Sequence, residues 1–173
     1  RLIGCLQRLA ALGEAAGSCY VEIGVFRGLT LVSVGRAASA VEVFGIDNFS
    51  QFDPRGENKS VVLGHAKELH LANLHLIDAD FEVALADLDG FVGGRKVGPY
   101  FVDGPHDYRS QLLCLELMKP HLADGAAIVV DDSNYLHVRQ ANRDFLTLNR
   151  DYKLIFEAYT PCHPRNMDAS QLR

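Results

Sequence analysis

Short apolar runs alternate with mixed polar and apolar segments along almost the whole chain. The apolar runs have the length of buried strands and lie at residues 20–23, 41–46, 74–77, 100–102 and 126–130. Before and between them, apolar residues recur at the three- and four-residue spacing of amphipathic helices, as in residues 2–12. Strands that alternate with helices predict an α/β domain with a mainly parallel sheet and helices on both faces.

The same pattern sets the expected boundaries of the remaining elements. Helices are expected over residues 2–13, 30–38, 65–72, 81–88, 107–121 and 138–148, and a sixth strand over residues 152–159. Proline, glycine and charged residues predict surface loops over residues 50–60 and 90–98. The purely apolar run 126–130 is typical of a central parallel strand that is buried on both faces.

Length and composition indicate one globular domain. A chain of 173 residues with 48% hydrophobic and 23% charged residues can bury a single core, so residues 1–173 are interpreted as one unit. Within it, residues 1–17 are the N-terminal helix and its connector, and residues 160–173, which contain two prolines, are an irregular tail.

Charge and cysteine usage narrow the class of partner and the compartment. The net charge is −5 without a basic tail or stripe, which excludes the usual pattern of nucleic-acid binding. No apolar run is long enough to span a membrane. The four cysteines are scattered without metal-ligand spacing, which favours a reducing, cytoplasmic compartment. The chain begins with Arg1, so processing, a fragment or a lost targeting segment stays open, and so does a homo-oligomer.

A glycine turn follows the first predicted strand. Gly24 and Gly28 enclose Val25, Phe26 and Arg27, and a predicted helix begins directly after them. A strand, a glycine turn and a helix N-terminus together favour a binding place for a nucleotide-like ligand. Phe26 stands where the dinucleotide fingerprint has its second glycine, so an ordinary strand-to-helix turn fits the residues equally well.

Asp47 ends the second predicted strand, 23 positions after Gly24. In doubly wound folds an acidic residue at about this offset accepts hydrogen bonds from both hydroxyls of a ribose. The alternative interpretation is a turn-forming aspartate, which is common after strands.

Further acidic residues follow the carboxyl ends of the later strands. Asp80 follows the third strand, Asp103 the fourth, and Asp131 and Asp132 the fifth. Three carboxylates from adjacent strands would repel one another, and a divalent cation is the common resolution. Oxygen ligands favour Mg²⁺, with Mn²⁺ and Ca²⁺ as alternatives. A helix cap for Asp80 or Asp132 and a strand-end hydrogen bond for Asp131 are the structural alternatives.

His106 follows Asp103 by three residues, and Gly104 and Pro105 between them predict a turn that displays both side chains. A histidine beside a metal site is a candidate general base, because its ordinary pKa lies near 6.5. A histidine exposed on the surface, or one that only supports the metal ligands, is the alternative interpretation.

Three of these segments resemble one enzyme family. Residues 21–30 resemble motif I of class I S-adenosylmethionine-dependent methyltransferases, in the variant that has a bulky residue at the central glycine, as in catechol O-methyltransferases. Residues 101–108 are similar to the I-D-G-x-H-x-Y signature of the sugar and small-molecule O-methyltransferases related to macrocin O-methyltransferase. Residues 129–132 resemble the second metal motif of that group, and the resemblance covers residues 20–159.

The resemblance implies a single-domain, doubly wound, Rossmann-like methyltransferase sheet and a role for each matching residue. Gly24, Gly28 and Thr30 would lie at the methionine end of S-adenosylmethionine, with Glu22 at its amino group. The remaining implied roles are ribose binding by Asp47, adenine contact by Asp80 and Phe81, and Mg²⁺ binding by Asp103, Asp131 and Asp132.

The implied activity is Mg²⁺-assisted methyl transfer to a hydroxyl group of a small molecule such as a sugar, a catechol or a natural product. Some metal-dependent relatives place a lysine where this chain has His106, so the base is His106 or Asp103. A seventh, antiparallel strand is not evident after Tyr159. A nicotinamide-dependent oxidoreductase and a non-catalytic cofactor-binding domain are the alternative functions.

Overall fold

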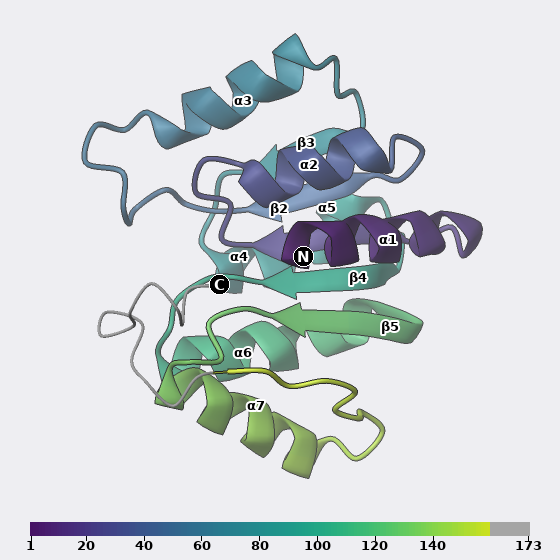
Figure 1. Cartoon of the computed structure of the whole chain (residues 1–173), viewed down its shortest axis with the longest axis vertical. Coiled ribbons are helices and arrows are strands. Elements are labelled where there is room, and N and C mark those ends of the chain that lie inside the picture. The colour runs from purple at the N-terminus through teal and green to yellow at the C-terminus, as the bar shows by residue number, and fades with distance from the viewer. Residues whose placement is uncertain (160–173) are drawn as a thin grey trace.

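The computed structural model describes residues 1–159 and contains one parallel sheet (Figure 1). Its five strands are β1 (Cys19–Ile23), β2 (Val43–Ile46), β3 (Leu74–Ile77), β4 (Val97–Val102) and β5 (Leu122–Val130). They lie in the order β3-β2-β1-β4-β5, and every neighbouring pair is parallel. The chain thus starts in the middle of the sheet, winds to one edge and then to the other, which confirms the predicted doubly wound fold.

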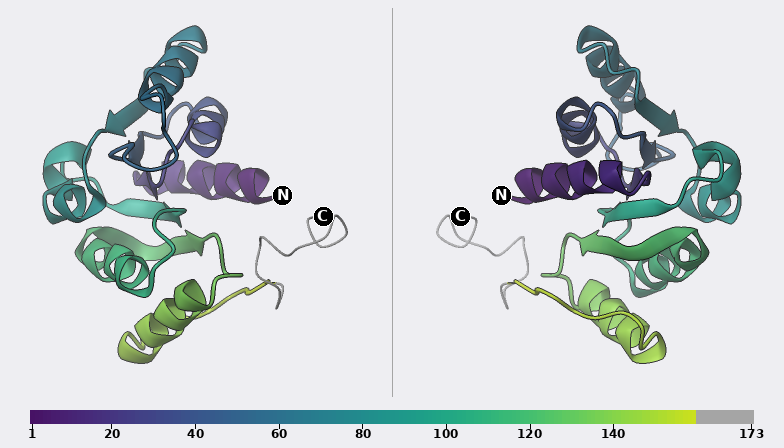
Figure 2. Two further views of the ribbon diagram at one scale, coloured as in Figure 1. Left: turned by 90° about the vertical axis from the view of Figure 1, so that its left-hand side faces the viewer. Right: turned by 90° about the vertical axis from the view of Figure 1, so that its right-hand side faces the viewer.

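Helices cover both faces of this sheet. They are α1 (Leu2–Ala15), α2 (Leu29–Ala37), α3 (Asn58–Glu68), α4 (Phe81–Ala86), α5 (Leu88–Val92), α6 (Tyr108–Met118), the short 3₁₀ helix η1 (Lys119–His121) and α7 (Leu136–Leu148). Figure 2 shows α1 and α2 on one face, with α4, α5 and α6 on the other.

Each face of the sheet has its own hydrophobic core. Val21 and Ile23 of β1 pack into the core that includes side chains of α4 to α7, whereas Tyr20 packs into the core that includes side chains of α1, α2 and α3. Successive strand residues point to opposite faces, so a strand covered on both sides is apolar at most positions, with the buried Glu22 of β1 as an exception. This requirement explains the short apolar runs in the sequence.

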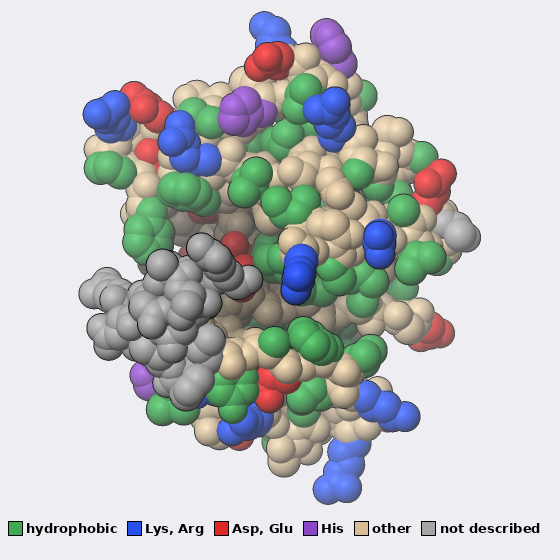
Figure 3. All heavy atoms as spheres, viewed as in Figure 1, with side chains coloured by type: hydrophobic (Ala, Val, Ile, Leu, Met, Phe, Trp, Pro, Cys, Tyr) green, Lys and Arg blue, Asp and Glu red, His purple; other side chains and the backbone are tan. Residues whose placement is uncertain are grey.

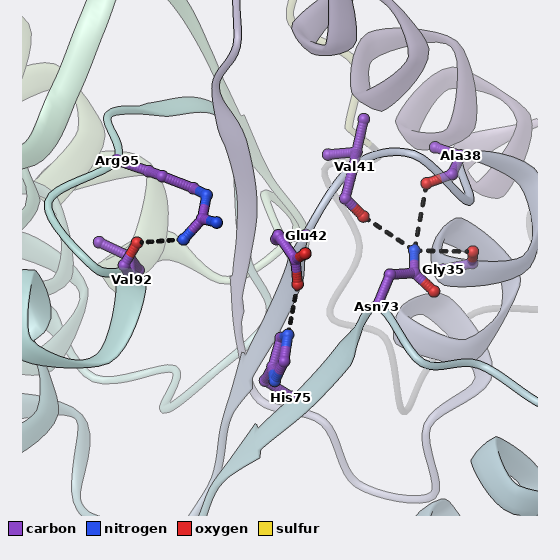
Figure 4. A network of polar contacts seen from close by, with 8 residues as sticks. All are labelled: Gly35, Ala38, Val41, Glu42, Asn73, His75, Val92 and Arg95. Carbon is purple, nitrogen blue, oxygen red and sulfur yellow. Dashed lines mark hydrogen bonds and ion pairs between the residues drawn. The ribbon is translucent and has the colours of Figure 1, made fainter.

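Polar contacts close the edge of the sheet at which the strands begin (Figure 4). Nδ2 of the buried Asn73, just before β3, donates to the carbonyl oxygens of Gly35, Ala38 and Val41 at 3.1, 3.2 and 2.8 Å. Nearby, Nε2 of His75 lies 2.5 Å from Oε2 of Glu42. These side chains hold the connection between α2 and β2 against β3, which is a structural role.

Two predicted boundaries between loop and helix are wrong. The loop expected over residues 50–60 gives way to α3 at Asn58, and α3 ends at Glu68 instead of spanning 65–72. Asp53 accepts hydrogen bonds from the backbone N–H groups of Glu57 and Asn58 at 2.9 and 3.1 Å, and so starts the helix early. Val62 is the one buried apolar residue of α3, which left little periodic signal in the sequence.

The loop expected over residues 90–98 is also shorter than predicted. Helix α5 continues to Val92, and β4 begins at Val97. Both valines are fully buried, so packing of apolar side chains overrides the four glycines in this stretch.

The predictions for the end of the sheet need two corrections. The apolar run 126–130 belongs to β5, which is an edge strand in residues 1–159 and is half-buried where a central strand was expected. Helices on both faces still cover it, because Ile128 and Val129 pack against opposite cores. The strand predicted over residues 152–159 is absent, and Ile155 there is 94% exposed. The predicted tail, residues 160–173, lies outside the described residues.

Candidate functional site

The carboxyl ends of β4 and β5 bring three titratable side chains together. One potential metal-ligand atom each from Asp103, His106 and Asp132 lies within 4.8 Å of the other two. Nε2 of His106 is 2.6 Å from Oδ2 of Asp132. Figure 3 shows acidic side chains inside a hollow on the side of the molecule toward which the strands point in Figure 1. We refer to these three residues as the acidic cluster.

The loop after β4 fixes the first two members of the cluster. The backbone N–H of Asp103 donates to the carbonyl of Ile23 at 2.9 Å, which continues the pairing of β4 with β1 by one residue. Three residues later, Asp107 caps α6 by accepting from the backbone N–H of Ser110 at 3.0 Å. His106 lies between these two anchors, and its ring stacks on Tyr135 at a centroid distance of 4.7 Å.

The loop after β5 presents Asp132 with unusual backbone geometry. Asp132 has a φ angle of +55°, a left-handed conformation that is uncommon outside glycine. Its N–H donates to Oδ1 of Asp131 at 2.8 Å, and its carbonyl accepts from the N–H of Tyr135 at 2.9 Å. One carboxylate oxygen of Asp131 thus accepts a backbone hydrogen bond. Asp131 is not one of the three residues whose potential ligand atoms lie together. Its role as a metal ligand stays a prediction.

Burial and repulsion raise the pKa of Asp103 to about 7, with burial as the larger cause and the carboxylates of Asp131 and Asp132 next. The hydrogen bond to Asp132 raises the pKa of His106. A divalent cation would relieve this repulsion, and its oxygen ligands would come from Asp103 and Asp132. The donor set therefore fits the predicted cation, with His106 as a third neighbour.

The glycine turn packs directly on the acidic cluster. Gly24 has a φ angle of +87°, and a Cβ at this position would overlap the backbone carbonyl of Asp103. Gly28 has a φ angle of +81°, and a Cβ there would lie 3.1 Å from a methyl group of Val62. Gly24 is therefore required by the backbone of Asp103, whereas Gly28 is favoured by its positive φ angle and by a tight contact with the side chain of Val62.

Asp47 reaches the same turn from the end of β2. Its Oδ2 accepts from the backbone N–H groups of Val25 and Phe26 at 2.9 and 2.8 Å. Its Oδ1 accepts from the N–H of Phe49 at 2.7 Å. The structure thus brings Asp47 to the glycine turn, a contact that its position in the sequence did not predict, and ribose binding by Asp47 stays a prediction.

Glu22 and Thr30 lie together beneath the turn. The carboxyl group of Glu22 is fully buried and accepts from the hydroxyls of Tyr20 at 2.7 Å and of Thr30 at 3.0 Å. Burial raises the pKa of Glu22 to about 8. The pair connects β1 to the start of α2, and its predicted contact with a cofactor is not tested by this geometry.

The two residues predicted at adenine follow β3. Asp80 caps α4 by accepting from the N–H of Glu82 at 2.9 Å, as expected for the start of that helix. Nδ2 of Asn48 lies 3.4 Å from the other carboxylate oxygen of Asp80. Phe81 is only 8% exposed and packs into the core, and its contact with adenine stays a prediction. Sequence reasoning missed Asn48 and Tyr135, for which spacing gives no signal.

A hollow among the described residues lies away from this edge. It has a volume of about 420 Å³ and is lined by residues that include Arg36, Glu42 and His70, near the amino end of β2. It holds none of the cluster residues, and we place the candidate site at the carboxyl edge because the acidic cluster and the glycine turn meet there. Among residues 1–159, no helix has the combined length and apolar character that crossing a membrane requires.

Comparison with known proteins identifies the family. The sequence model of a family described as "Methyltransferase domain" matches residues 21–133, which is more than half of the chain. The chain belongs to this methyltransferase family. The assignment confirms the class I methyltransferase predicted from the motifs, and the matched segment contains the glycine turn and the whole acidic cluster. The methyltransferase domain has no significant match among curated protein sequences.

Solved structures share the fold of the methyltransferase domain. A TDP-rhamnose 3′-O-methyltransferase of calicheamicin biosynthesis aligns with a TM-score of 0.63 and 18% identity over 84% of this chain and 68% of its own. An O-methyltransferase from Bacillus cereus, in complex with SAH, aligns with a TM-score of 0.63 and 14% identity over 86% of this chain and 70% of its own. The O-methyltransferase TomG from Streptomyces achromogenes, in complex with SAM, aligns with a TM-score of 0.60 and 18% identity over 87% of this chain and 69% of its own. At these identities the likeness shows the fold.

Proposed function

We propose that the domain transfers a methyl group from S-adenosylmethionine to a hydroxyl group of a small molecule, assisted by Mg²⁺ at the acidic cluster. The observation that carries this proposal is the position of the cluster. Asp103, His106 and Asp132 lie at the carboxyl edge of a methyltransferase sheet, and the backbone of Asp103 touches the glycine turn. Ligands of open parallel sheets bind at this edge.

The structural neighbours support the two substrates. The Bacillus cereus and TomG O-methyltransferases hold SAH and SAM, and the calicheamicin enzyme methylates a sugar hydroxyl of TDP-rhamnose. We infer a sugar, catechol or natural-product hydroxyl as the acceptor here. The net charge of −5 supports a small-molecule partner over nucleic acid or a membrane surface. A cytoplasmic location and a homo-oligomer are further proposals.

The cofactor would lie along the carboxyl ends of β1, β2 and β3, beside the acidic cluster. Asp47 would face its ribose, Gly24 and Gly28 would shape the wall at its methionine end, and Glu22 with Thr30 would support that wall from below. Asp80 and Phe81 would lie toward adenine. S-adenosylmethionine supplies an electrophilic methyl group, so these residues have to align it with the acceptor oxygen.

His106 is the proposed base of this reaction. The carboxylate of Asp132 can only accept, so the neutral imidazole carries its proton on Nε2 and leaves Nδ1 to take the proton of the acceptor hydroxyl. The imidazolium that forms is stabilised by Asp132. Asp103 and Asp132, with Asp131 beside them, would hold Mg²⁺, which lowers the pKa of a bound hydroxyl. Asp103 is the second candidate base.

Transfer of a labelled methyl group from S-adenosylmethionine tests the proposal. The acceptor panel contains a nucleotide sugar, a catechol and a phenolic natural product, each with Mg²⁺ or with EDTA. We expect transfer to at least one acceptor, loss of transfer in EDTA, and loss in Asp103→Asn with cofactor binding retained. Transfer that is unaffected by EDTA would remove the metal from the proposal. Absence of methyl transfer, together with oxidation or reduction of an acceptor when a nicotinamide cofactor is supplied, would replace the proposal with the oxidoreductase alternative.

A further inference from the structure

One carboxylate, that of Asp47, collects three backbone N–H groups from two different loops. Val25 and Phe26 in the turn after β1 donate to Oδ2 at 2.9 and 2.8 Å, and Phe49 in the loop after β2 donates to Oδ1 at 2.7 Å. Hydrogen bonds to a charged acceptor are roughly twice as strong as neutral ones. Asp47 therefore fastens the glycine turn to the end of the neighbouring strand through backbone groups of the protein itself.

Two of these three donors have strained backbone conformations. Phe26 has a φ angle of +50° and Phe49 one of +52°, in the left-handed region. This region costs an L-residue with a bulky side chain about 1–2 kcal/mol, and it persists only where the surroundings impose it. Phe26 and Phe49 both donate to Asp47, so its carboxylate stabilises both backbones in this form, and the hydrogen bond from the Gly28 N–H to the Val25 carbonyl supports the turn around Phe26.

The remaining capacity of Asp47 for a ligand is small. A carboxylate offers about four lone-pair sites, and the backbone occupies three of them here. Without giving up a backbone bond, Asp47 can accept from one ribose hydroxyl and not from two. Binding of a ribose diol alone therefore does not account for the way in which this side chain is used.

We propose that Asp47 is a positioning residue, which builds the glycine turn before the cofactor arrives and acts on affinity mainly through that turn. The inference rests on the proposed function and deepens it. Because Gly24 in the same turn packs on the carbonyl of Asp103, the turn that Asp47 holds also forms one wall of the acidic cluster. Replacement of Asp47 should then lower the affinity even for a cofactor analogue that makes no hydrogen bond to this side chain.

Two ligands separate positioning from direct ribose binding. S-adenosylhomocysteine has both ribose hydroxyls, and its 2′,3′-dideoxy analogue has neither. Calorimetric titration of wild type and Asp47→Ala with each ligand gives a double cycle. We expect Asp47→Ala to weaken both ligands by at least about tenfold, the size of effect that loss of a charged hydrogen bond produces. If the analogue binds both proteins equally while S-adenosylhomocysteine is weakened, Asp47 only binds ribose and the proposal is overturned.

Asp53→Ala is the matched control, because Asp53 also accepts two backbone N–H groups, those of Glu57 and Asn58, but at the start of α3. It should leave both affinities within about twofold of wild type. If Asp53→Ala and Asp47→Ala lower the two affinities equally, the effect is a general destabilisation of the fold and the proposal is overturned.

A measurement without ligand keeps the proposal separate from the function. Amide hydrogen exchange in the ligand-free protein should accelerate at Val25, Phe26 and Phe49 in Asp47→Ala, with unchanged protection in β4. If that variant does not fold, Asp47→Asn keeps the side-chain volume, turns one acceptor into a donor and should accelerate exchange at one or two of the three amides. Unchanged exchange at all three overturns the proposal. Failure of wild type to bind S-adenosylhomocysteine would instead refute the proposed function.

Discussion

Gly24 and Asp103 touch through their backbones, so closely that a Cβ on residue 24 would overlap the carbonyl group of Asp103. The two residues leave neighbouring strands, β1 and β4, and the N–H of Asp103 is bonded to the carbonyl of Ile23 at 2.9 Å. The glycine turn and the acidic cluster are therefore parts of one rigid edge. A disturbance of either should be felt by the other.

Gly24→Ala should destabilise the domain strongly. The added methyl group meets backbone, which cannot move without breaking the pairing of β1 with β4, and the φ angle of +87° is strained for alanine as well. We expect a loss of at least about 3 kcal/mol in the free energy of unfolding, measured by urea denaturation.

Gly17→Ala separates strain from overlap. Gly17 has a φ angle of +65°, and a Cβ added there would lie in open space. The free energy of unfolding should therefore fall by only about 1 kcal/mol in this variant. Equal losses in Gly17→Ala and Gly24→Ala would contradict the tight contact with Asp103.

Glu22→Gln should change how stability depends on pH. Burial raises the pKa of Glu22 from an ordinary 4.5 to about 8, so between these values the folded chain keeps a proton that the unfolded chain has lost. The stabilisation from this group is complete below pH 4.5 and is lost as the pH rises through about 8. Glutamine is neutral throughout, so urea denaturation of the variant should show a flatter decline over this window. A decline as steep as that of wild type would mean that Glu22 does not titrate there.

Asp131→Asn and Asp132→Asn should differ in metal affinity. Asp132 belongs to the acidic cluster, whereas Oδ1 of Asp131 accepts the N–H of Asp132, a bond that an asparagine oxygen can replace. Titration with Mg²⁺ and Mn²⁺ should show a loss of about tenfold or more for Asp132→Asn and a smaller loss for Asp131→Asn. A larger loss at Asp131 would show that the loop after β5 rearranges to bind the cation.

His106→Gln should reduce the rate and leave cofactor binding intact. Removal of a general base typically costs about 10²- to 10⁴-fold in kcat. The hydrogen bond that the imidazole donates to Asp132 raises the pKa of His106, so the rate of wild type should rise with pH through a value above 6.5. In Asp132→Asn, with saturating metal, this rise should move to lower pH. A profile that keeps its midpoint in His106→Gln would assign the titration to another group, with Asp103 as the next candidate.

Much of the fold could be predicted because strands buried on both faces are apolar at most positions. All five residues of β1 are buried, and residues 20–23 of its observed span Cys19–Ile23 were predicted. β3 was predicted with its observed boundaries, Leu74 to Ile77, although it is a partly exposed edge strand. The start of α3 was missed because its signal is the side chain of Asp53, which caps the helix from several residues away. The strand expected over residues 152–159 failed because alternating apolar residues form a strand only beside a partner, and none pairs with them in residues 1–159.

The candidate site could be predicted as a set of residues but not as a set of contacts. Chain order placed Asp103 and Asp132 at the same edge, and the spacing of His106 marked it as a neighbour. The left-handed backbone of Asp132, which turns it toward His106 while Asp131 binds the backbone, leaves no trace in the pattern. The same holds for Asp47, two of whose three backbone partners lie 21 and 22 positions earlier in the chain.

Calorimetric titration of the wild-type protein with S-adenosylhomocysteine, and in parallel with NAD, tests the central claim most directly. The account predicts saturable binding of S-adenosylhomocysteine with one site per chain and no detectable binding of NAD. Binding of NAD without binding of S-adenosylhomocysteine would contradict it, because the glycine turn and the acidic cluster would then serve a different cofactor.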